Sequence, residues 1–316
     1  MKDKIKKYFP MLYEYALHIK WKAKLRKINA LKKTDSAEYP RLIADIYEEK
    51  IGKPLDLNNP TTYTQKVQWS KLYDASPEKS RLSDKYEVRE WVKEKIGEKY
   101  LVPLLGVWDK FDDIDFSSLP ESFVLKTTHG SGTNIIVPDK NKFNRRTARL
   151  RINDWLKTDY AYCAGFEMHY SAIKPRIIAE QYIKTESGDL CDYKFLCFGG
   201  KAYYVWVDVD RYGDHRRNIY DLAWNLQPFR QYYKNTDKEI PKPENLDEMT
   251  EIAEKLCEGF SHVRVDLYNA DGKIYFGEMT FTNGSGFERI IPDSADEMLG
   301  SLWNIDTDKT AESGAK

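Results

Sequence analysis

"FVLKTTHGSGTNIIV", residues 123–137, consists of two apolar runs of strand type joined by a short loop of Thr, His, Gly and Ser. Lys126 stands inside the first run, and an amine among apolar neighbours is costly to desolvate unless it meets an anionic partner. The glycines of the loop leave backbone N–H groups uncrowded, which suits phosphate oxygens. The stretch therefore predicts a β-hairpin that binds a phosphate-bearing ligand, with a nucleotide as the first hypothesis.

The composition of the 316-residue chain is that of a folded protein with one large domain or two to three small ones. No run of eighteen apolar residues is present, which argues against a transmembrane helix. The N-terminus lacks the apolar segment of a signal peptide, so we expect a cytoplasmic protein. The cysteines form no CxxC pair and no zinc-type spacing, and we interpret them as reduced thiols: Cys163, Cys191, Cys197 and Cys257.

Charge is unevenly distributed along a chain whose formal net charge is zero. Residues 1–33 contain eleven Lys or Arg against Asp3 and Glu14, a net +9 that leaves −9 for the remainder. An acidic body argues against nucleic-acid binding. The basic segment is predicted to be a helix that either docks on the body or lies on an anionic membrane surface. Its apolar stripe is imperfect, so we favour docking, with at most a loose contact to the inner face of the membrane.

The first hundred residues are predicted to be mostly helical. Helices are expected over 10–33 and 40–52, from about Thr62, and in a Ser83-capped segment that ends at Gly97. A short strand follows at 101–108. The pattern changes to strands from Ser122 onward, with a helical interval at 144–172 and an amphipathic helix at 246–260. Two further hairpins are expected to turn at Gly199-Gly200 and Asp271-Gly272, so the fold class is α+β.

The last predicted hairpin carries two carboxylates on paired strands. Asp266 in "VRVDLY" and Glu278 in "IYFGEMTF" are each flanked by apolar residues. If the Asp271-Gly272 turn sets the register, the two side chains lie close together and repel unless a cation lies between them. Oxygen ligands of this kind, with a phosphate as co-ligand, suit Mg²⁺. The alternative is that one carboxylate pairs with Arg264.

Two weaker signals complete the picture. "IIAEQYI" places Glu180 in an otherwise apolar strand whose backbone could meet an adenine edge. "YYVWVDVD" ends in Asp208-x-Asp210, which resembles the metal-binding DxD motif of nucleotide-sugar glycosyltransferases. The motif is short enough to arise by chance in an acid-rich chain, and it leaves Lys126 and the carboxylate pair unexplained.

The order of these features is similar to that of the ATP-grasp superfamily: lysine strand, glycine-rich loop, E-x-Y-I hinge, R-x-D strand and a glutamate strand. The resemblance is closest to the TupA-like branch of teichuronopeptide and capsular polysaccharide biosynthesis. It extends from about Gly52 to Pro292 over the blocks "NNPTTYTQKVQW", "SDKYEVREWV", "GEKYLVPLLGVW", "LPESFVLKTTHGSG", "KPRIIAEQYI", "DYKFLCFGGK" and "GEMTF". P-loop and Rossmann phosphate motifs are absent from the sequence. The resemblance implies an ATP-grasp fold behind a mostly helical N-terminal region.

The resemblance also implies roles for matched positions. Lys85 and Lys126 would bind the nucleotide, and Gly130, Ser131 and Gly132 would form a flexible lid over its phosphates. The adenine hinge and the acid for the ribose hydroxyls would be Glu180, Gln181, Tyr182, Ile183 and Asp192. Asp266 and Glu278 match the Mg²⁺ ligands; many relatives carry Asn where this chain has Thr280, so a hydroxyl or a water is expected to stand in. Arg264 would steady an acyl phosphate.

The implied activity is ATP-dependent carboxylate–amine ligation, with a hexuronic acid or similar sugar carboxylate as one substrate and an amino acid or other amine as the second. Lys194 is a further catalytic candidate. Binding of the acceptor carboxylate is assigned to Arg211, His215, Arg216 and Arg217, whose alternative is a solvated loop. The competing functions are the glycosyltransferase of Asp208-x-Asp210 and a non-catalytic nucleotide-binding scaffold.

The expected organisation follows the same resemblance. A basic helix at 1–33 and a helical region at 34–120 precede the two ATP-grasp subdomains. The first of these, at 121–184, carries the lid, and the second, at 185–305, carries the metal site. Residues 306–316 are polar and are expected to form a frayed tail.

Overall fold

The computed structural model describes residues 10–185, 190–209 and 214–306. Five helices come first, and α3 and α4 confirm the sequence predictions. Gly52 ends α3 in the left-handed conformation at φ 78°. Thr62 begins α4 with a capping box that includes Gln65. The bounds of the five helices are α2 Pro10–Leu31, α3 Tyr39–Ile51, α4 Tyr63–Tyr73, α5 Pro77–Ser83 and α6 Val88–Lys95.

The helix predicted to end at Gly97 is present as α6, but its predicted start at a Ser83 cap is wrong. Ser83 is the last residue of α5, and α6 begins only at Val88. The carboxylate of Asp84 accepts hydrogen bonds from the backbone N–H groups of Tyr86 and Glu87, which turns the chain between the two helices. Lys85 therefore lies in a turn, where its side chain can extend away from either helix.

A four-stranded antiparallel sheet follows, in the order β1-β4-β2-β3. One face packs on α7 (Arg145–Leu156) through Phe123, Leu125 and Trp155. The other face carries Val124 and Lys126, because side chains alternate along β2. The strands are β1 Leu104–Trp108, β2 Phe123–Thr127, β3 Asn134–Val137 and β4 Ile177–Gln181. The predicted helix over 144–172 is confirmed only as far as Leu156; short 3₁₀ turns at Tyr160–Tyr162 and Met168–Tyr170 follow.

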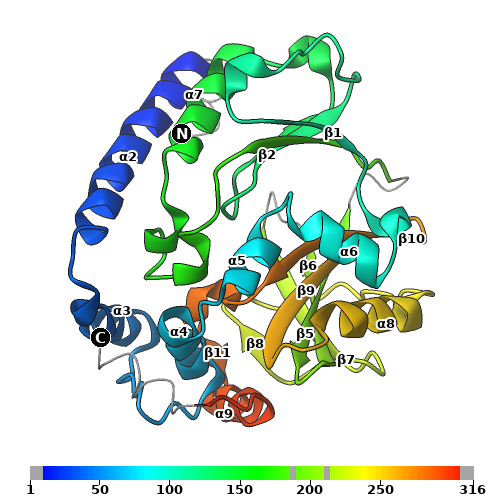
Figure 1. The fold of residues 1–316 in the computed structure, drawn as a ribbon. Coiled ribbons are helices and arrows are strands. Elements are labelled where there is room, and N and C mark those ends of the chain that lie inside the picture. The colour runs from blue at the N-terminus through cyan, green and yellow to red at the C-terminus, as the bar shows by residue number, and fades with distance from the viewer. Residues whose placement is uncertain (1–9, 186–189, 210–213, 307–316) are drawn as a thin grey trace.

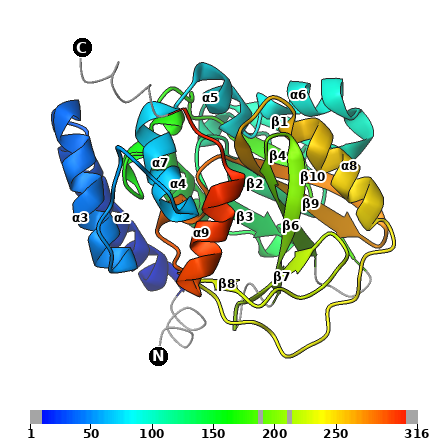
Figure 2. The ribbon, with the colours of Figure 1, turned by 90° about the horizontal axis from the view of Figure 1, so that it is seen from below.

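A five-stranded antiparallel sheet forms the other half of the molecule, in the order β10-β9-β5-β6-β7. Helix α8 (Leu246–Cys257) covers one face, while α4 and α9 (Asp293–Leu302) cover part of the other, as Figures 1 and 2 show. Both hairpins predicted for this half are confirmed. Its strands are β5 Cys191–Phe198, β6 Lys201–Val209, β7 Arg216–Asp221, β9 His262–Ala270 and β10 Lys273–Thr280; a separate ladder joins β8 Arg230–Gln231 to β11 Ile290–Ile291.

Helix α2 runs along the outside of the molecule and packs against α7 (Figure 1). Trp21 donates its indole N–H to Asp154 O and to Thr158 Oγ1, at 3.2 and 3.1 Å. His18 Nδ1 lies 2.5 Å from the Asp154 carboxylate, and Arg151 pairs with Glu14. The docking predicted for the basic helix is thus present over Pro10–Leu31. None of the described helices could span a bilayer, and no disulfide joins the four cysteines, all of which lie among the described residues.

Candidate active site

Asp266 and Glu278 are directly opposite each other on β9 and β10. The hairpin pairs Ala270 with Lys273, and a regular ladder from that turn would place residue 277 opposite Asp266. A β-bulge at Gly277 shifts the register by one residue, so that Glu278 takes that place. A Cβ on Gly277 would lie 2.9 Å from the backbone oxygen of Asp266, so this approach requires glycine. The predicted proximity of the carboxylates therefore depends on the bulge.

Arg264 joins the two carboxylates. Its Nε and Nη2 donate to the two oxygens of Asp266 at 2.6 and 2.7 Å, and Nη2 also donates to Glu278 Oε1 at 3.1 Å. Nη2 reaches Thr280 Oγ1 at 3.1 Å, and Nη1 donates to Asn283 Oδ1 at 2.6 Å. The alternative in which a carboxylate pairs with Arg264 is thus realised. Burial lowers the pKa of Arg264, but Asp266 outweighs burial and raises it, so the guanidinium stays charged.

Lys194 adds a second buried cation on the neighbouring strand β5. Its Nζ donates to Asp192 Oδ2 at 2.6 Å and to Asp266 Oδ2 at 2.7 Å. Burial lowers the pKa of Lys194, but the carboxylates of Asp192 and Asp266 outweigh burial and raise it above the ordinary value. Asp192, assigned to the ribose hydroxyls by resemblance, is therefore a buried partner of Lys194 here. The side chains form a continuous ionic row across β5, β9 and β10.

Lys126 has its anionic partner in Glu180 on the adjacent strand β4. Lys126 Nζ donates to Glu180 Oε2 at 2.6 Å, and Arg89 of α6 donates to Glu180 Oε1 at 3.2 Å. Arg89 also donates to the backbone oxygen of Val102 at 3.0 Å. Glu180 thus lies between two cations on the sheet face opposite α7. Because opposite charges compensate one another, the charges of Lys126 and Glu180 are tolerated inside the strands.

Lys85 connects the two sheets. From the α5–α6 turn, its Nζ donates to Gly130 O at 2.5 Å and lies 3.9 Å from Glu278 Oε2. Arg176, at the start of β4, anchors that turn through Asp84 and Glu87 at 2.9 and 2.7 Å. Burial lowers the pKa of Lys85. Lys85, Lys126, Glu180, Lys194, Arg264, Asp266 and Glu278 are called the charged site below.

The glycine-rich loop closes one end of the charged site. Gly130 is buried against the ring of Tyr160, where a Cβ would lie only 2.6 Å from the ring. Ser131 and Gly132 are exposed, and Gly132 has φ 70°, which favours glycine. The loop thus needs both glycines for its shape, and Lys85 is bonded to its backbone.

Glu278 is the more open of the two carboxylates. Its side chain is 33% exposed, whereas that of Asp266 is 3% exposed. Burial raises the pKa of Glu278, but Lys85, Arg264 and Lys194 outweigh burial and lower it to about 2. Glu278 is therefore ionised throughout the physiological range.

The donor set fits a Mg²⁺ ion in its chemistry. Asp266, Glu278 and Thr280 supply hard oxygen atoms on one face of the β9–β10 hairpin. Within the described ranges no group of three or more His, Cys, Asp or Glu side chains could hold a metal by itself. A bound Mg²⁺ would therefore rely on phosphate oxygens or water for its other ligands, as Mg²⁺ commonly does.

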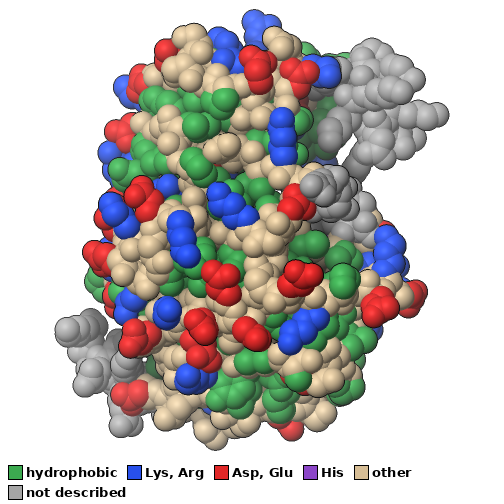
Figure 3. Space-filling view, turned by 90° about the vertical axis from the view of Figure 1, so that its right-hand side faces the viewer, with side chains coloured by type: hydrophobic (Ala, Val, Ile, Leu, Met, Phe, Trp, Pro, Cys, Tyr) green, Lys and Arg blue, Asp and Glu red, His purple; other side chains and the backbone are tan. Residues whose placement is uncertain are grey.

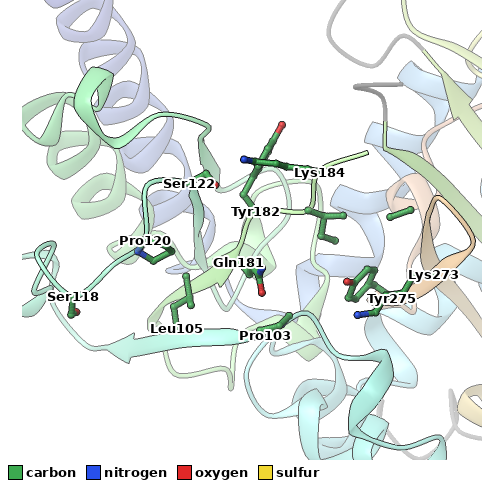
Figure 4. A pocket seen from close by; sticks show the side chains of 12 residues that line it. Pro103, Leu105, Ser118, Pro120, Ser122, Gln181, Tyr182, Lys184, Lys273 and Tyr275 are labelled. Atoms are coloured by element: carbon green, nitrogen blue, oxygen red, sulfur yellow. The ribbon is translucent and has the colours of Figure 1, made fainter. Parts of the chain in front are cut away.

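The predicted adenine hinge lines a pocket of about 730 Å³. Gln181, Tyr182 and Ile183 line it together with Lys273 and Tyr275 of the β9–β10 hairpin and with Pro103 and Leu105. Figure 4 shows Gln181 and Tyr275 on different sides of this pocket. Tyr275 and Lys273 lie toward the turn of the hairpin that carries Asp266 and Glu278 further along. Figure 3 shows basic and acidic side chains interspersed on this side of the molecule.

The basic cluster predicted to bind the acceptor is already paired. Arg217 donates to both oxygens of Asp208, at 2.5 and 3.1 Å, and to Glu288 at 3.1 Å. Arg216 pairs with Asp214, and His215 lies 3.4 Å from Asp208. The Arg217 guanidinium outweighs burial and holds the pKa of Asp208 well below its usual range. Arg211 and Asp210 lie outside the described residues.

These pairs weaken two predictions. The solvated-loop alternative is wrong for Arg217, because this residue is buried. Its role in binding the acceptor is also weakened, because its guanidinium already binds two carboxylates and an acceptor carboxylate would have to displace one of them. Asp208 is equally engaged, so the DxD-type metal site has no free carboxylate at that position.

Sequence reasoning missed three participants: Arg89, Gly277 and Asn283. Arg89 looks like any basic residue on an amphipathic helix, and only the packing of α6 beside β4 brings it to Glu180. Asn283 stands in "FTNGSGF", whose glycines signal an irregular loop but not the contact with Arg264. Gly277 inside a strand pattern is a recognised sign of a bulge, and that signal was available.

A family model and several solved structures are similar to this chain. The family model described as TupA-like ATPgrasp matches residues 65–304, most of the chain. D-alanine–D-alanine ligase from Bacillus anthracis complexed with ATP is 18% identical over 73% of this chain, with a TM-score of 0.40. L-amino acid ligase from Bacillus licheniformis is 15% identical over 70%, with a TM-score of 0.43. The chain spans 64% and 49% of these two structures, respectively.

None of the curated proteins matches the chain. The family match covers the hairpin of Lys126, the strand of Glu180, and the β9–β10 hairpin that joins Asp266 to Glu278. The chain belongs to the TupA-like ATP-grasp family.

Proposed function

We propose that this enzyme joins a carboxylate to an amine through an acyl phosphate, with a sugar carboxylate such as a hexuronic acid as acceptor in the synthesis of capsular or other cell-surface polysaccharide. One observation carries the proposal. Cations from both sheets and from the α5–α6 turn meet the carboxylates of Glu180, Asp266 and Glu278. These cations are Lys85, Lys126, Lys194 and Arg264. Such a row suits the transfer of a phosphoryl group, in which negative charge moves between two oxygens.

The ATP would lie across the charged site with its base at the hinge pocket. Gln181, Tyr182 and Ile183 line that pocket, and Tyr275 offers an aromatic wall opposite them. Lys126 bonds to Glu180, which precedes Gln181 of the pocket in the chain, and Lys85 lies 3.9 Å from Glu278 Oε2, so the phosphates would contact these two lysines. When the nucleotide enters, its phosphates would compete for the hydrogen bonds that Lys85 now makes with Gly130 and Lys126 with Glu180.

Phosphoryl transfer is the first step. A carboxylate oxygen of the acceptor attacks the γ-phosphorus, the bond to the β-phosphate bridging oxygen breaks, and ADP leaves. Mg²⁺ held by Asp266 and Glu278, with Thr280 nearby, would neutralise phosphate charge. Arg264 is fixed by Asp266 and Asn283 and stays charged, so it can orient the acyl phosphate without rearranging.

Amide formation is the second step. The amine nitrogen attacks the acyl carbon, inorganic phosphate leaves with the electron pair of the C–O bond, and the amine loses a proton. Water would hydrolyse the acyl phosphate, so the glycine-rich loop above Lys85 has to exclude it. Since the reaction consumes ATP, we place the enzyme in the cytoplasm.

The test is a matrix of uronic-acid glycans and sugar nucleotides against amines and amino acids, with ADP release as the readout. The proposal predicts that ADP release requires both a carboxylate and an amine, with one amide formed per ADP. Reduction of the uronic carboxyl to the alcohol is the matched control and should abolish turnover. Equal ADP release with the reduced glycan would contradict the proposal.

A further inference from the structure

Helix α2 has two different faces. The inner one packs against the body at spacings of four, three and seven residues, through Glu14, His18, Trp21 and Ile28. The outer one carries Met11, Leu12, Tyr15 and Ile19, whose exposures are 41, 64, 60 and 53%. Apolar residues lie on both faces of α2, which is why the sequence shows an imperfect apolar stripe.

The exposed apolar cluster is unusual in this molecule. Among the described residues, nine large apolar side chains are exposed, and four of them are these neighbours on α2. Met11, Tyr15 and Ile19 follow one another at intervals of four, which places them in one stripe. Lys22 and Arg26 continue the same stripe toward the C-terminal end of α2, and Lys20 and Lys27 are exposed beside it.

We infer that the outer face of α2, defined by Met11, Leu12, Tyr15, Ile19, Lys22 and Arg26, binds the anionic surface of a lipid bilayer. A helix that lies in the plane of an interface inserts apolar side chains among acyl chains while its basic residues meet anionic headgroups. The long stems of Lys and Arg allow the charges to remain at headgroup level while the apolar residues go deeper.

Charge complementarity favours a membrane over a second copy of this chain. In a two-fold dimer built on this face, Lys22 and Arg26 would meet either their own copies or the apolar residues of the second copy, with no acidic residue exposed on the face to compensate their charge. Four apolar side chains also bury far less than the area of about 1,200–2,000 Å² of a stable interface. An anionic bilayer offers acyl chains to the apolar residues of this face and anionic headgroups to its basic residues.

Because α2 is docked on the body, its contact with a membrane would also set the orientation of the enzyme. His18 and Trp21 bond to α7, and Glu14 pairs with Arg151, so the helix is fixed to the body rather than free. Figure 1 shows α2 along the outer edge of the molecule, with its outer face away from both sheets. Binding through that face would therefore orient the whole enzyme on the membrane.

The test is co-sedimentation of the full chain with vesicles of phosphatidylcholine alone or with phosphatidylglycerol. We compare Leu12→Gln/Tyr15→Gln/Ile19→Gln with the control Ile136→Gln/Tyr203→Gln/Leu226→Gln, which removes exposed apolar side chains of the same three types elsewhere. We also compare Lys22→Gln/Arg26→Gln/Lys27→Gln with Lys110→Gln/Lys242→Gln/Lys255→Gln. Glutamine is a good helix former, so α2 should persist; circular dichroism and thermal unfolding check this.

The expected result is binding to anionic vesicles that falls at least about tenfold in both α2 variants, with both controls close to the unchanged chain. A Tyr15→Trp variant should show a blue shift with anionic vesicles only. The inference is overturned if the unchanged chain does not sediment with anionic vesicles, or if the α2 variants bind as well as their controls. It is also overturned if sedimentation velocity shows a dimer that the apolar α2 variant dissolves while vesicle binding is unaltered.

Discussion

Asp266 and Glu278 face one another because β10 contains one residue more than β9 between the hairpin turn and the charged site. The extra residue is accommodated at Gly277, whose Cα lies against the backbone of Asp266. Side chains alternate along a strand, so without the bulge Glu278 would point to the opposite face of the sheet. The paired carboxylates are thus a property of the backbone at Gly277.

Gly277→Val should separate the carboxylates. Its side chain would clash with the backbone oxygen of Asp266 and force the strands apart or the bulge to shift. We expect at least a tenfold loss of ADP release and a loss of about 1–3 kcal/mol in the free energy of unfolding. Activity assays and urea unfolding measure the two effects. Unchanged activity in Gly277→Val would show that the bulge does not matter to the site.

Glu278→Gln should remove turnover while leaving the fold intact, because this side chain is partly exposed. We expect at least a hundredfold loss of ADP release and a modest loss of stability at pH 7, because solvent screens this partly exposed carboxylate. Glu251→Gln, an exposed glutamate on α8, is the matched control. Asp266→Asn should also lose turnover but, in addition, cost about 3 kcal/mol of stability, because Arg264 and Lys194 lose their shared buried partner. Normal ADP release by either folded variant would contradict the metal assignment.

ATP with Mg²⁺ should raise the melting temperature, whereas a UDP-sugar should not. At a ligand concentration a hundredfold above Kd, binding should add about 2–3 kcal/mol to the free energy of unfolding. Lys126→Met should remove most of this effect, because Lys126 lies beside the hinge strand. Differential scanning fluorimetry with each ligand checks it, and stabilisation by the UDP-sugar alone would favour a glycosyltransferase.

Asp208→Asn should be a stability defect rather than a specific loss of metal-dependent chemistry. Asn cannot compensate the charge of Arg217, which is buried and also meets Glu288. We expect a loss of about 3 kcal/mol, measured by urea unfolding, against almost none for the exposed Asp237→Asn. A fully stable Asp208→Asn protein would mean that Arg217 does not depend on this pair.

The contribution of Glu278 to stability should disappear in acid. Its pKa is about 2 in the folded protein against an ordinary value of 4.5, so the folded state favours the ionised form. The stabilisation is therefore fully present above pH 4.5 and is lost as the pH falls toward 2. The difference in unfolding free energy between the unchanged chain and Glu278→Gln should be constant from pH 7 to 5 and shrink at pH 4 and 3. A difference independent of pH would contradict the shift.

The sequence determined the local elements and the candidate chemistry. Gly52 and Thr62 mark helix ends, and Asp271-Gly272 marks a hairpin turn, because each choice depends on backbone conformation within a few residues. The candidate residues could be identified because charged side chains are rarely buried in apolar strands unless they are paired. They are Lys126, Glu180, Asp266 and Glu278.

Only the tertiary structure decided which of these charged side chains contact one another and which of them are already paired. Arg89 reaches Glu180, Asn283 reaches Arg264, and Arg217 reaches Glu288 across separations in sequence that no local pattern encodes. The placement of Lys85 in a turn, and the division of α2 into a docked and an exposed face, likewise depend on packing between elements. Hydrogen bonds and ion pairs act over a few ångströms, so they are fixed by the relative positions of whole helices and strands, and those positions follow from the burial of apolar faces over the entire chain.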